Sequence, residues 1–242
     1  NKLRRYEIAC LSDYDLLVAI TKRDLQQFRQ LGYRKPAMVT PIGIKGGDYE
    51  PDYASFERPP SIGFIGSLDW MPNQEGVEWF LQQVWPEVGY IYPDLELHIA
   101  GRNAPKKILN LKMPNVIVHG EVPDAKAFIN QHSLMVVPLW SGSGIRVKIL
   151  EGMALGRVVL TTKLGLEGID ARHQKEVLIA DTKTDFLEAI DFCMEHAGQL
   201  QPIGQRARTF VEDKFDNLTI ARQLVSMYQR LRSGHKKRIT YT

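Results

Sequence analysis

A short loop of serines and glycines precedes two cationic residues near the middle of the chain. Residues 141–144 alternate serine and glycine after an apolar run, and Arg146 and Lys148 fall in the predicted first turn of a helix that begins near Ile145. A strand, a glycine loop and a helix start in this order present free backbone N–H groups to an anion. Cations at a helix N-terminus are opposed by the helix dipole, by about 0.3–1 kcal/mol each. The segment therefore favours a phosphate site, and two cations suit a diphosphate.

One carboxylate interrupts the apolar stretch that follows this loop. Glu151 lies within residues 149–154, which are otherwise apolar or glycine. A carboxylate in such a place needs solvent or a polar ligand, and dinucleotide-binding folds use a carboxylate to hold a ribose diol. A second interpretation stays open, in which the helix is solvated and Lys148 pairs with Glu151 on its surface.

Apolar runs that alternate with helical patterns must position these residues. Most runs are near-continuous Val, Ile and Leu, as in strands that helices cover on both faces. Strand–helix–strand repetition predicts an α/β fold, with a Rossmann-like three-layer domain around a parallel sheet. The predicted strands are residues 16–20, 38–40, 61–65, 95–100, 116–118, 134–138, 158–161 and 177–180. The predicted helices are residues 22–31, 73–84, 124–131, 145–155, 184–196, 199–214 and 218–231, with Asn73 as an N-cap.

The rhythm of strands and helices breaks once, in a segment with two adjacent glycines and three prolines. We predict a linker at residues 46–60 and a complete Rossmann-like domain at residues 61–232. Residues 1–45 hold too few elements for a core of their own, so we interpret them as a remnant of another domain. Residues 233–242 form a basic tail, which is either a disordered terminus or a contact with a membrane surface.

Composition excludes several classes of protein. The formal net charge of +3 does not require nucleic acid as a partner. The two cysteines, Cys10 and Cys193, lie far apart without a metal-binding pattern, so we expect reduced thiols and a cytoplasmic protein. No apolar run approaches the roughly 18 residues that span a bilayer. The chain opens on Asn1, and we expect further residues upstream.

The segment of residues 141–168 resembles the signature region of family-4-type (group 1) glycosyltransferases. These are retaining enzymes of GT-B architecture, in which two Rossmann-like domains face each other. The resemblance implies that residues 1–45 come from the N-terminal, acceptor-binding domain and that residues 61–232 form the donor-binding domain. It extends to residues 15–24, 40–43, 63–73, 98–101, 118–120 and 136–139.

The family's motif has two glutamates with seven residues between them. Glu151 matches the second, which implies that it holds the nucleoside ribose, whereas Ser143 stands in place of the first, which contacts the donor sugar. Ser67 and Pro72 replace the arginine and lysine that commonly grip the diphosphate, so we expect Arg146 and Lys148 to supply this charge and to stabilise the leaving diphosphate. The expected donor-binding residues are Gly66, Ser67, Gly101, Val122, Gly142, Ser143, Gly144, Ile145 and Glu151.

The resemblance implies transfer of a sugar from a nucleoside-diphosphate donor, without metal or cofactor, in polysaccharide or glycoconjugate assembly. The implied partners are the donor, a saccharide or lipid-linked acceptor and the missing N-terminal domain. We expect this chain alone to bind nucleotide weakly and to transfer no sugar. The alternatives are a non-catalytic nucleotide-sugar-binding subunit, which Ser143 favours, and a nucleotide-sugar epimerase or a phosphorylase of the same architecture. Base, sugar, acceptor and oligomeric state stay open.

Overall fold

The computed structural model describes residues 2–11 and 13–239 and divides the chain into two compact units. The larger unit is residues 46–214, and the smaller one combines residues 1–45 with residues 215–242. The first division falls where the sequence places the start of the linker. The second division, between residues 214 and 215, lies inside the predicted domain of residues 61–232, because the last helix groups with residues 1–45. The predicted linker belongs to the larger unit.

A six-stranded parallel sheet forms the centre of the larger unit, as far as the structure describes the chain. Its strands lie in the order β5-β4-β3-β6-β7-β8, which is that of a Rossmann fold. The predicted α/β fold class is therefore confirmed, and each predicted strand overlaps an observed one. The strands are β3 Ile62–Ile65, β4 Leu97–Ala100, β5 Val116–Gly120, β6 Leu134–Val137, β7 Val158–Thr161 and β8 Leu178–Ile179.

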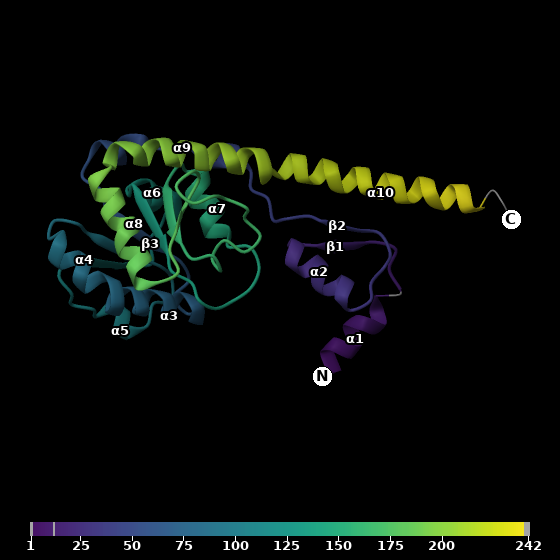
Figure 1. Ribbon diagram of the computed structural model, residues 1–242, viewed down its shortest axis with the longest axis horizontal. Coiled ribbons are helices and arrows are strands. Elements are labelled where there is room, and N and C mark those ends of the chain that lie inside the picture. The colour runs from purple at the N-terminus through teal and green to yellow at the C-terminus, as the bar shows by residue number, and fades with distance from the viewer. Residues whose placement is uncertain (1, 12, 240–242) are drawn as a thin grey trace. The chain divides into compact units, whose positions relative to one another are not determined.

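Helices cover both faces of this sheet (Figure 1). Figure 1 shows α3, α4 and α5 on one side and α6, α7 and α9 on the other. A single long helix was expected at residues 73–84, but α3 passes through a π-helical turn at Phe80–Val84 into α4. The helices are α3 Met71–Trp79, α4 Trp85–Ile91, α5 Lys106–Leu109, α6 Ala125–Asn130, α7 Val147–Ala154, α8 Lys183–Glu195 and α9 Ala197–Lys214.

The strands form the core because their side chains are apolar on both faces. Every residue of β6 and β7 is buried, and Phe64, Ile99 and Val136 are each 1% exposed. Aromatic rings join α3 to α8, since Trp79 and Phe186 lie 5.5 Å apart between ring centroids. This packing holds the sheet rigid beneath the loops that leave its carboxyl edge.

Two glycines allow backbone to approach backbone at this carboxyl edge. A Cβ atom on Gly101 would lie 1.9 Å from the Gly66 carbonyl oxygen, and one on Gly76 would lie 1.8 Å from the Pro138 carbonyl oxygen. No side chain fits in either place without movement of the backbone. The close approaches bring the loops after β3, β4 and β6 together.

A buried arginine ties the predicted linker to the larger unit. The linker forms two short 3₁₀ helices, Gly46–Asp48 and Tyr53–Glu57. Arg157 is 0% exposed, and its guanidinium lies over the rings of Tyr53 and Phe56 and donates a hydrogen bond to the Ser55 hydroxyl. Burial lowers the pKa of Arg157 to about 10. The linker is therefore packed against α9 and against Arg157, the residue before β7.

The smaller unit contains a two-stranded parallel sheet and three helices within the described residues. The elements are α1 Lys2–Cys10, β1 Leu17–Ala19, α2 Lys22–Gln30, β2 Ala37–Val39 and α10 Asn217–Ile239. After β2, Ile44 exchanges backbone hydrogen bonds with Phe215 and Asn217, which fixes the start of α10. None of the described helices is both long and apolar enough to cross a bilayer. The basic tail lies partly outside the described residues, and nothing is described of its side chains from residue 234 on.

Candidate functional site

The loops after β3 and β6 leave the sheet at the point where its strand order reverses. Chain order runs outward from β3 to β4 and β5 on one side, and from β6 to β7 and β8 on the other. Such a point opens a crevice at the carboxyl edge, and ligands of doubly wound sheets bind there. The serine and glycine loop of residues 141–144 lies on one side of this point, and Gly66 and Ser67 lie on the other.

Arg146 is the N-cap of α7, one residue before the helix begins at Val147. The prediction that both cations lie in the first turn is therefore wrong for Arg146 and right for Lys148. Arg146 is 5% exposed, and its Nη1 donates to the backbone oxygens of Ser143 and Gly144. Its Nε and Nη2 have no hydrogen-bond partner among the residues that the structure describes. Burial lowers the pKa of this guanidinium, and the nearby Glu167 charge raises it. A buried cation with two idle donors at the crevice is suited to an anionic ligand.

Lys148 points from α7 toward the end of β3 and the start of α3. Its Nζ donates to Asn73 Oδ1 at 2.6 Å and to the Ile65 carbonyl at 3.4 Å. The ammonium also lies 4.6 Å from the centroid of the Phe64 ring. The residue is half-buried as a whole, but its charged end is deep, and burial with the charge of Arg146 lowers the pKa of Lys148 to about 7. The surface pair with Glu151 does not form, because Lys148 binds Asn73 instead.

Asn73 is not the N-cap that its sequence position suggested. The N-cap of α3 is Trp70, and Asn73 lies at the third helical position with 3% exposure. Its Nδ2 donates to the Ser67 carbonyl at 2.7 Å while its Oδ1 accepts from Lys148. Lys148 is 75 positions away from Asn73 along the chain, so a local capping rule could not predict this contact.

Ser67 is the centre of a polar network at the ends of β3 and β4. Its hydroxyl donates to Asp69 at 2.5 Å and accepts from the Arg102 Nε at 3.0 Å. Asn103 donates to the other Asp69 oxygen at 2.8 Å. These bonds from Ser67 and Asn103 lower the pKa of Asp69. Arg102 thus holds the loop after β3 in this structure.

Glu151 faces the linker. Tyr49 donates from its phenol to Glu151 Oε1 at 3.0 Å. Burial and the Glu151 charge raise the pKa of Tyr49 to about 12, so the phenol stays protonated as a donor. Nothing in the sequence pointed to Tyr49, because 102 positions separate it from Glu151.

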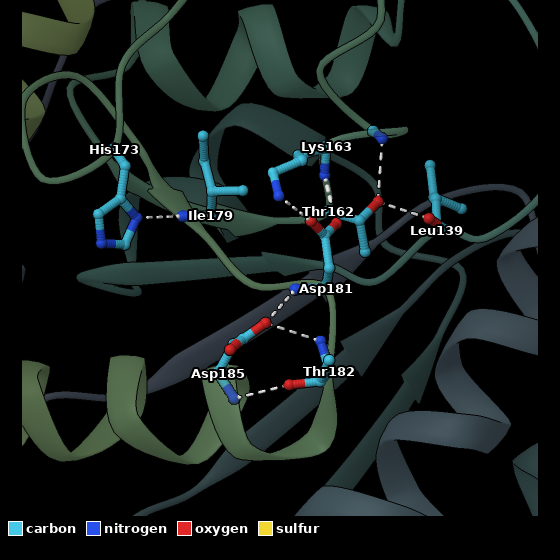
Figure 2. Close-up of polar contacts among 9 residues, drawn as sticks. Leu139, Thr162, Lys163, His173, Ile179, Asp181, Thr182 and Asp185 are labelled. Carbon is cyan, nitrogen blue, oxygen red and sulfur yellow. Dashed lines mark hydrogen bonds and ion pairs between the residues drawn. The ribbon is translucent and has the colours of Figure 1, made fainter.

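A third loop, after β7, is fixed against the loop after β6. Figure 2 shows the Thr162 hydroxyl donating to the Leu139 carbonyl, and Lys163 joined to Asp181. The same hydroxyl accepts from the Gly165 N–H at 2.9 Å. These contacts orient the segment that carries Glu167, whose charge acts on Arg146. Thr162 is a further positioning residue that the sequence had not singled out.

The predicted donor-binding residues follow one edge of the sheet. Gly66 and Ser67 follow β3, Gly101 follows β4, Val122 follows β5, residues 142–145 follow β6, and Glu151 lies in α7. Gly142 and Gly144 have φ of +96° and +84°, a conformation that favours glycine. The side chain of Ile145 is buried, so only its backbone can meet a ligand. Trp140 packs 4.0 Å from Trp79 between ring centroids, which makes it part of the support beneath the loop.

Three of the six histidines, His98, His119 and His132, form a cluster at β4 and β5. His98 Nδ1 and His119 Nε2 lie 3.0 Å apart, and the rings of His98 and His132 lie 4.5 Å apart between centroids. Burial lowers the pKa of His132 to about 3. His98 lies in β4 and His119 in β5, so this group packs around the strands.

Known proteins give independent findings about the chain. Residues 59–196 match the family described as "Glycosyl transferases group 1". Over 167 residues, 65% of this chain, the sequence is 26% identical to a Klebsiella pneumoniae protein named "Uncharacterized 44.6 kDa protein in cps region", of which it covers 43%.

Solved glycosyltransferases share the fold. Sucrose-phosphate synthase from Thermosynechococcus elongatus matches 96% of this chain with a TM-score of 0.75 and 17% identity, over 62% of its own length. HepE from Anabaena, solved with UDP and glucose, matches 93% with a TM-score of 0.73 and 15% identity, over 66% of its length. TarM matches 94% with a TM-score of 0.77 and 14% identity, over 46% of its length.

This chain thus spans less than half of the curated relative and at most about two thirds of these three solved chains. The family match covers more than half of the 242 residues and includes every element from β3 to α8. By that match, the protein belongs to the group 1 glycosyltransferases.

Proposed function

We propose that this chain is the donor-binding part of a glycosyltransferase that uses a nucleoside-diphosphate sugar. The observation that carries the proposal is the buried Arg146, with two donors that lack partners, beside Lys148 at the start of α7. HepE and a pneumococcal O-GlcNAc transferase of the same fold were both solved with UDP, which supports a nucleoside diphosphate as the ligand. The relative named for a cps region supports a role in polysaccharide assembly.

The chemistry follows from the charges at the crevice. As the bond between sugar and diphosphate breaks, negative charge grows on the leaving phosphate. Arg146, Lys148 and the N–H groups of the glycine loop stabilise this charge without reorganising, because the fold already holds them in place. We propose that these cations do the work for which other transferases use a metal ion, and that the anomeric configuration is retained.

The remaining roles belong to the whole protein. Glu151 holds the ribose with the oxygen that Tyr49 leaves available, and the acceptor binds a domain preceding residue 46. The acceptor is a saccharide or a lipid-linked saccharide, and a peripheral membrane contact would bring the second kind within reach. We place the protein in the cytoplasm, where nucleotide sugars are made. The chain alone binds nucleotide weakly and transfers no sugar.

A thermal-shift screen of UDP and GDP, followed by calorimetry, tests the proposal. The better nucleotide should raise the melting temperature, since a ligand that binds only the folded state stabilises it. Arg146→Ala should weaken binding tenfold or more, because a charged hydrogen bond contributes about 1.5–3 kcal/mol. Arg206→Ala is the matched control, since Arg206 is exposed and its one hydrogen bond within the described part of the chain goes to the Lys175 carbonyl. Equal affinity of wild type and Arg146→Ala would contradict the assigned role.

Ser143 favours a second candidate, a non-catalytic nucleotide-sugar-binding subunit. Ser143 is exposed and brings no charge to the place where family members have a glutamate. An assay of donor hydrolysis by the whole protein separates the two. Hydrolysis or transfer identifies an enzyme, and binding without turnover identifies a binding subunit.

A further inference from the structure

We propose that Asn73 is a positioning residue for diphosphate binding, whose amide fixes the Lys148 ammonium against the loop after β3. The inference deepens the proposed function and rests on it for the identity of the anion. It concerns a residue that the sequence pattern assigned to helix capping. The structure gives it a different task.

Both polar atoms of the Asn73 amide form hydrogen bonds, one as a donor and the other as an acceptor. The Nδ2 donates to the Ser67 carbonyl at 2.7 Å, and the Oδ1 accepts from Lys148 Nζ at 2.6 Å. The residue is 3% exposed and sits at the third position of α3, so the helix fixes its backbone. One side chain therefore links the loop after β3 to the cation that enters from α7.

The ammonium needs such an acceptor because it is held close to Gly66. A Cβ atom on Gly66 would lie 2.9 Å from Lys148 Nζ and 2.8 Å from Asn73 Nδ2. A flexible lysine without a fixed partner would lose rotamer entropy each time it met a ligand. Two of its N–H groups bond Asn73 and Ile65, and no acceptor for the third is found among the described residues, so we assign it to the anion.

The choice of an amide has a chemical reason. An aspartate at position 73 would neutralise the lysine and repel a diphosphate, and it could not donate to the Ser67 carbonyl. An amide accepts from the ammonium and leaves its charge available. Arg146 supplies the other positive charge near Lys148. The bond between Asn73 and Lys148 therefore keeps two like charges close together before the ligand arrives.

The first experiment is calorimetry with pyrophosphate and with UDP on the full chain. Asn73→Ala should weaken both by about tenfold, as expected for the loss of a bond that orients a charged donor. Asn73→Asp keeps the size of the side chain and should weaken both at least as much. Gln74→Ala is the matched control: it removes an amide bond to the Leu68 carbonyl, one residue along the same helix, without touching Lys148. It should leave both affinities within about twofold.

A double-mutant cycle separates positioning from general support of the fold. In a Lys148→Met background, Asn73→Ala should cause less than about a twofold further loss. If Asn73→Ala costs the same with and without the lysine, or if Gln74→Ala costs as much, Asn73 does not act through Lys148 and the proposal fails.

A second measurement needs no ligand. Titration of the Lys148 side chain by NMR should show a higher pKa in Asn73→Asp and a lower pKa in Asn73→Ala. An unchanged pKa in both variants would overturn the proposal that Asn73 holds Lys148. If wild type binds neither pyrophosphate nor UDP, the proposed function fails, while this titration still decides whether Asn73 holds the lysine.

Discussion

The phenol of Tyr49 and the carboxylate of Glu151 lie 3.0 Å apart and join the linker to helix α7. The backbone of Tyr49 is also held in place, because Arg208 donates to its carbonyl at 2.7 Å and to the Ala154 carbonyl at 2.9 Å. Tyr49 thus orients one carboxylate oxygen, and the other has no hydrogen-bond partner in the part of the chain that the structure describes. That geometry suits a group that must meet a ribose in a single orientation.

Removing the carboxylate should affect nucleotides and leave pyrophosphate unchanged. Glu151→Ala should weaken UDP about tenfold and Tyr49→Phe about threefold, because a hydrogen bond to a charged group contributes about 1.5–3 kcal/mol and an orienting bond less. Pyrophosphate lacks a ribose, so its affinity should be the same in both variants. Calorimetry with the two ligands checks this, and a parallel loss for pyrophosphate would place Glu151 at the phosphates.

The lowered pKa of Lys148 predicts that diphosphate binding takes up protons. With a pKa of about 7, much of this lysine is neutral at pH 8, and an anion in the crevice favours the charged form. Affinity for UDP should therefore fall as pH rises above 7. Calorimetry at pH 8 in two buffers of different ionisation enthalpy should show proton uptake for wild type and little for Lys148→Met. Equal uptake in the variant would assign the proton to another group.

The same lysine makes the ligand-free protein more stable at high pH. Its pKa in the folded state, about 7, lies below the ordinary value of 10.5, so the fold favours the neutral amine. The unfolded chain binds more protons between pH 7 and 10.5, and the free energy of unfolding contributed by this group rises through that window. Urea unfolding at pH 7 and pH 9.5 should show a smaller increase for Lys148→Met than for wild type.

His132 predicts a loss of stability in acid. Its pKa of about 3 lies below the ordinary 6.5, so its contribution is complete above pH 6.5 and is lost as pH falls toward 3. His98 and His119 add like charge when they are protonated, which worsens the repulsion. His132→Phe keeps a ring of similar size beside Phe128 and should flatten the fall of the melting temperature between pH 6.5 and 4. An unchanged pH profile would show that other groups control acid unfolding.

Arg157 predicts that the linker needs a guanidinium. Arg157→Lys keeps the charge but loses the planar contact with Tyr53 and Phe56 and part of the hydrogen bonding. We expect a loss of about 2–4 kcal/mol in urea, as for a disrupted buried network, and faster proteolysis within residues 46–60. The exposed Arg206→Lys should stay within about 0.5 kcal/mol. Equal stability of the two variants would contradict the role of Arg157.

The strands could be predicted because continuous apolar runs encode them locally. Residues 158–161 and 134–137 are buried throughout, and nothing in their surroundings overrides that preference. The π-helical turn at Phe80–Val84 could not be predicted in this way, because Trp85 and Phe80 pack into a core assembled from distant strands.

The residues of the candidate site also fall into two groups, those that the local sequence predicts and those that depend on distant contacts. The glycine loop and the cations could be found from residues that are neighbours in sequence. Asn73, Tyr49 and Thr162 could not, since their partners lie 75, 102 and 23 positions away and their residue types also suit caps and cores. The sequence therefore predicts the residues that carry charge, but it does not predict the residues that orient them.

The bare backbone contacts at Gly66, Gly76 and Gly101 limit how the site can be re-engineered. Any side chain at Gly76 or Gly101 would strike a carbonyl oxygen within 1.9 Å. Substitutions there would push α3 away from the loop after β6, or the loop after β4 away from the loop after β3, before they change a preference for base or sugar. A mutant library aimed at new donors should leave these glycines untouched. It should draw its diversity from Ser143, where the loop is exposed, and should keep Gly144, whose φ of +84° favours glycine.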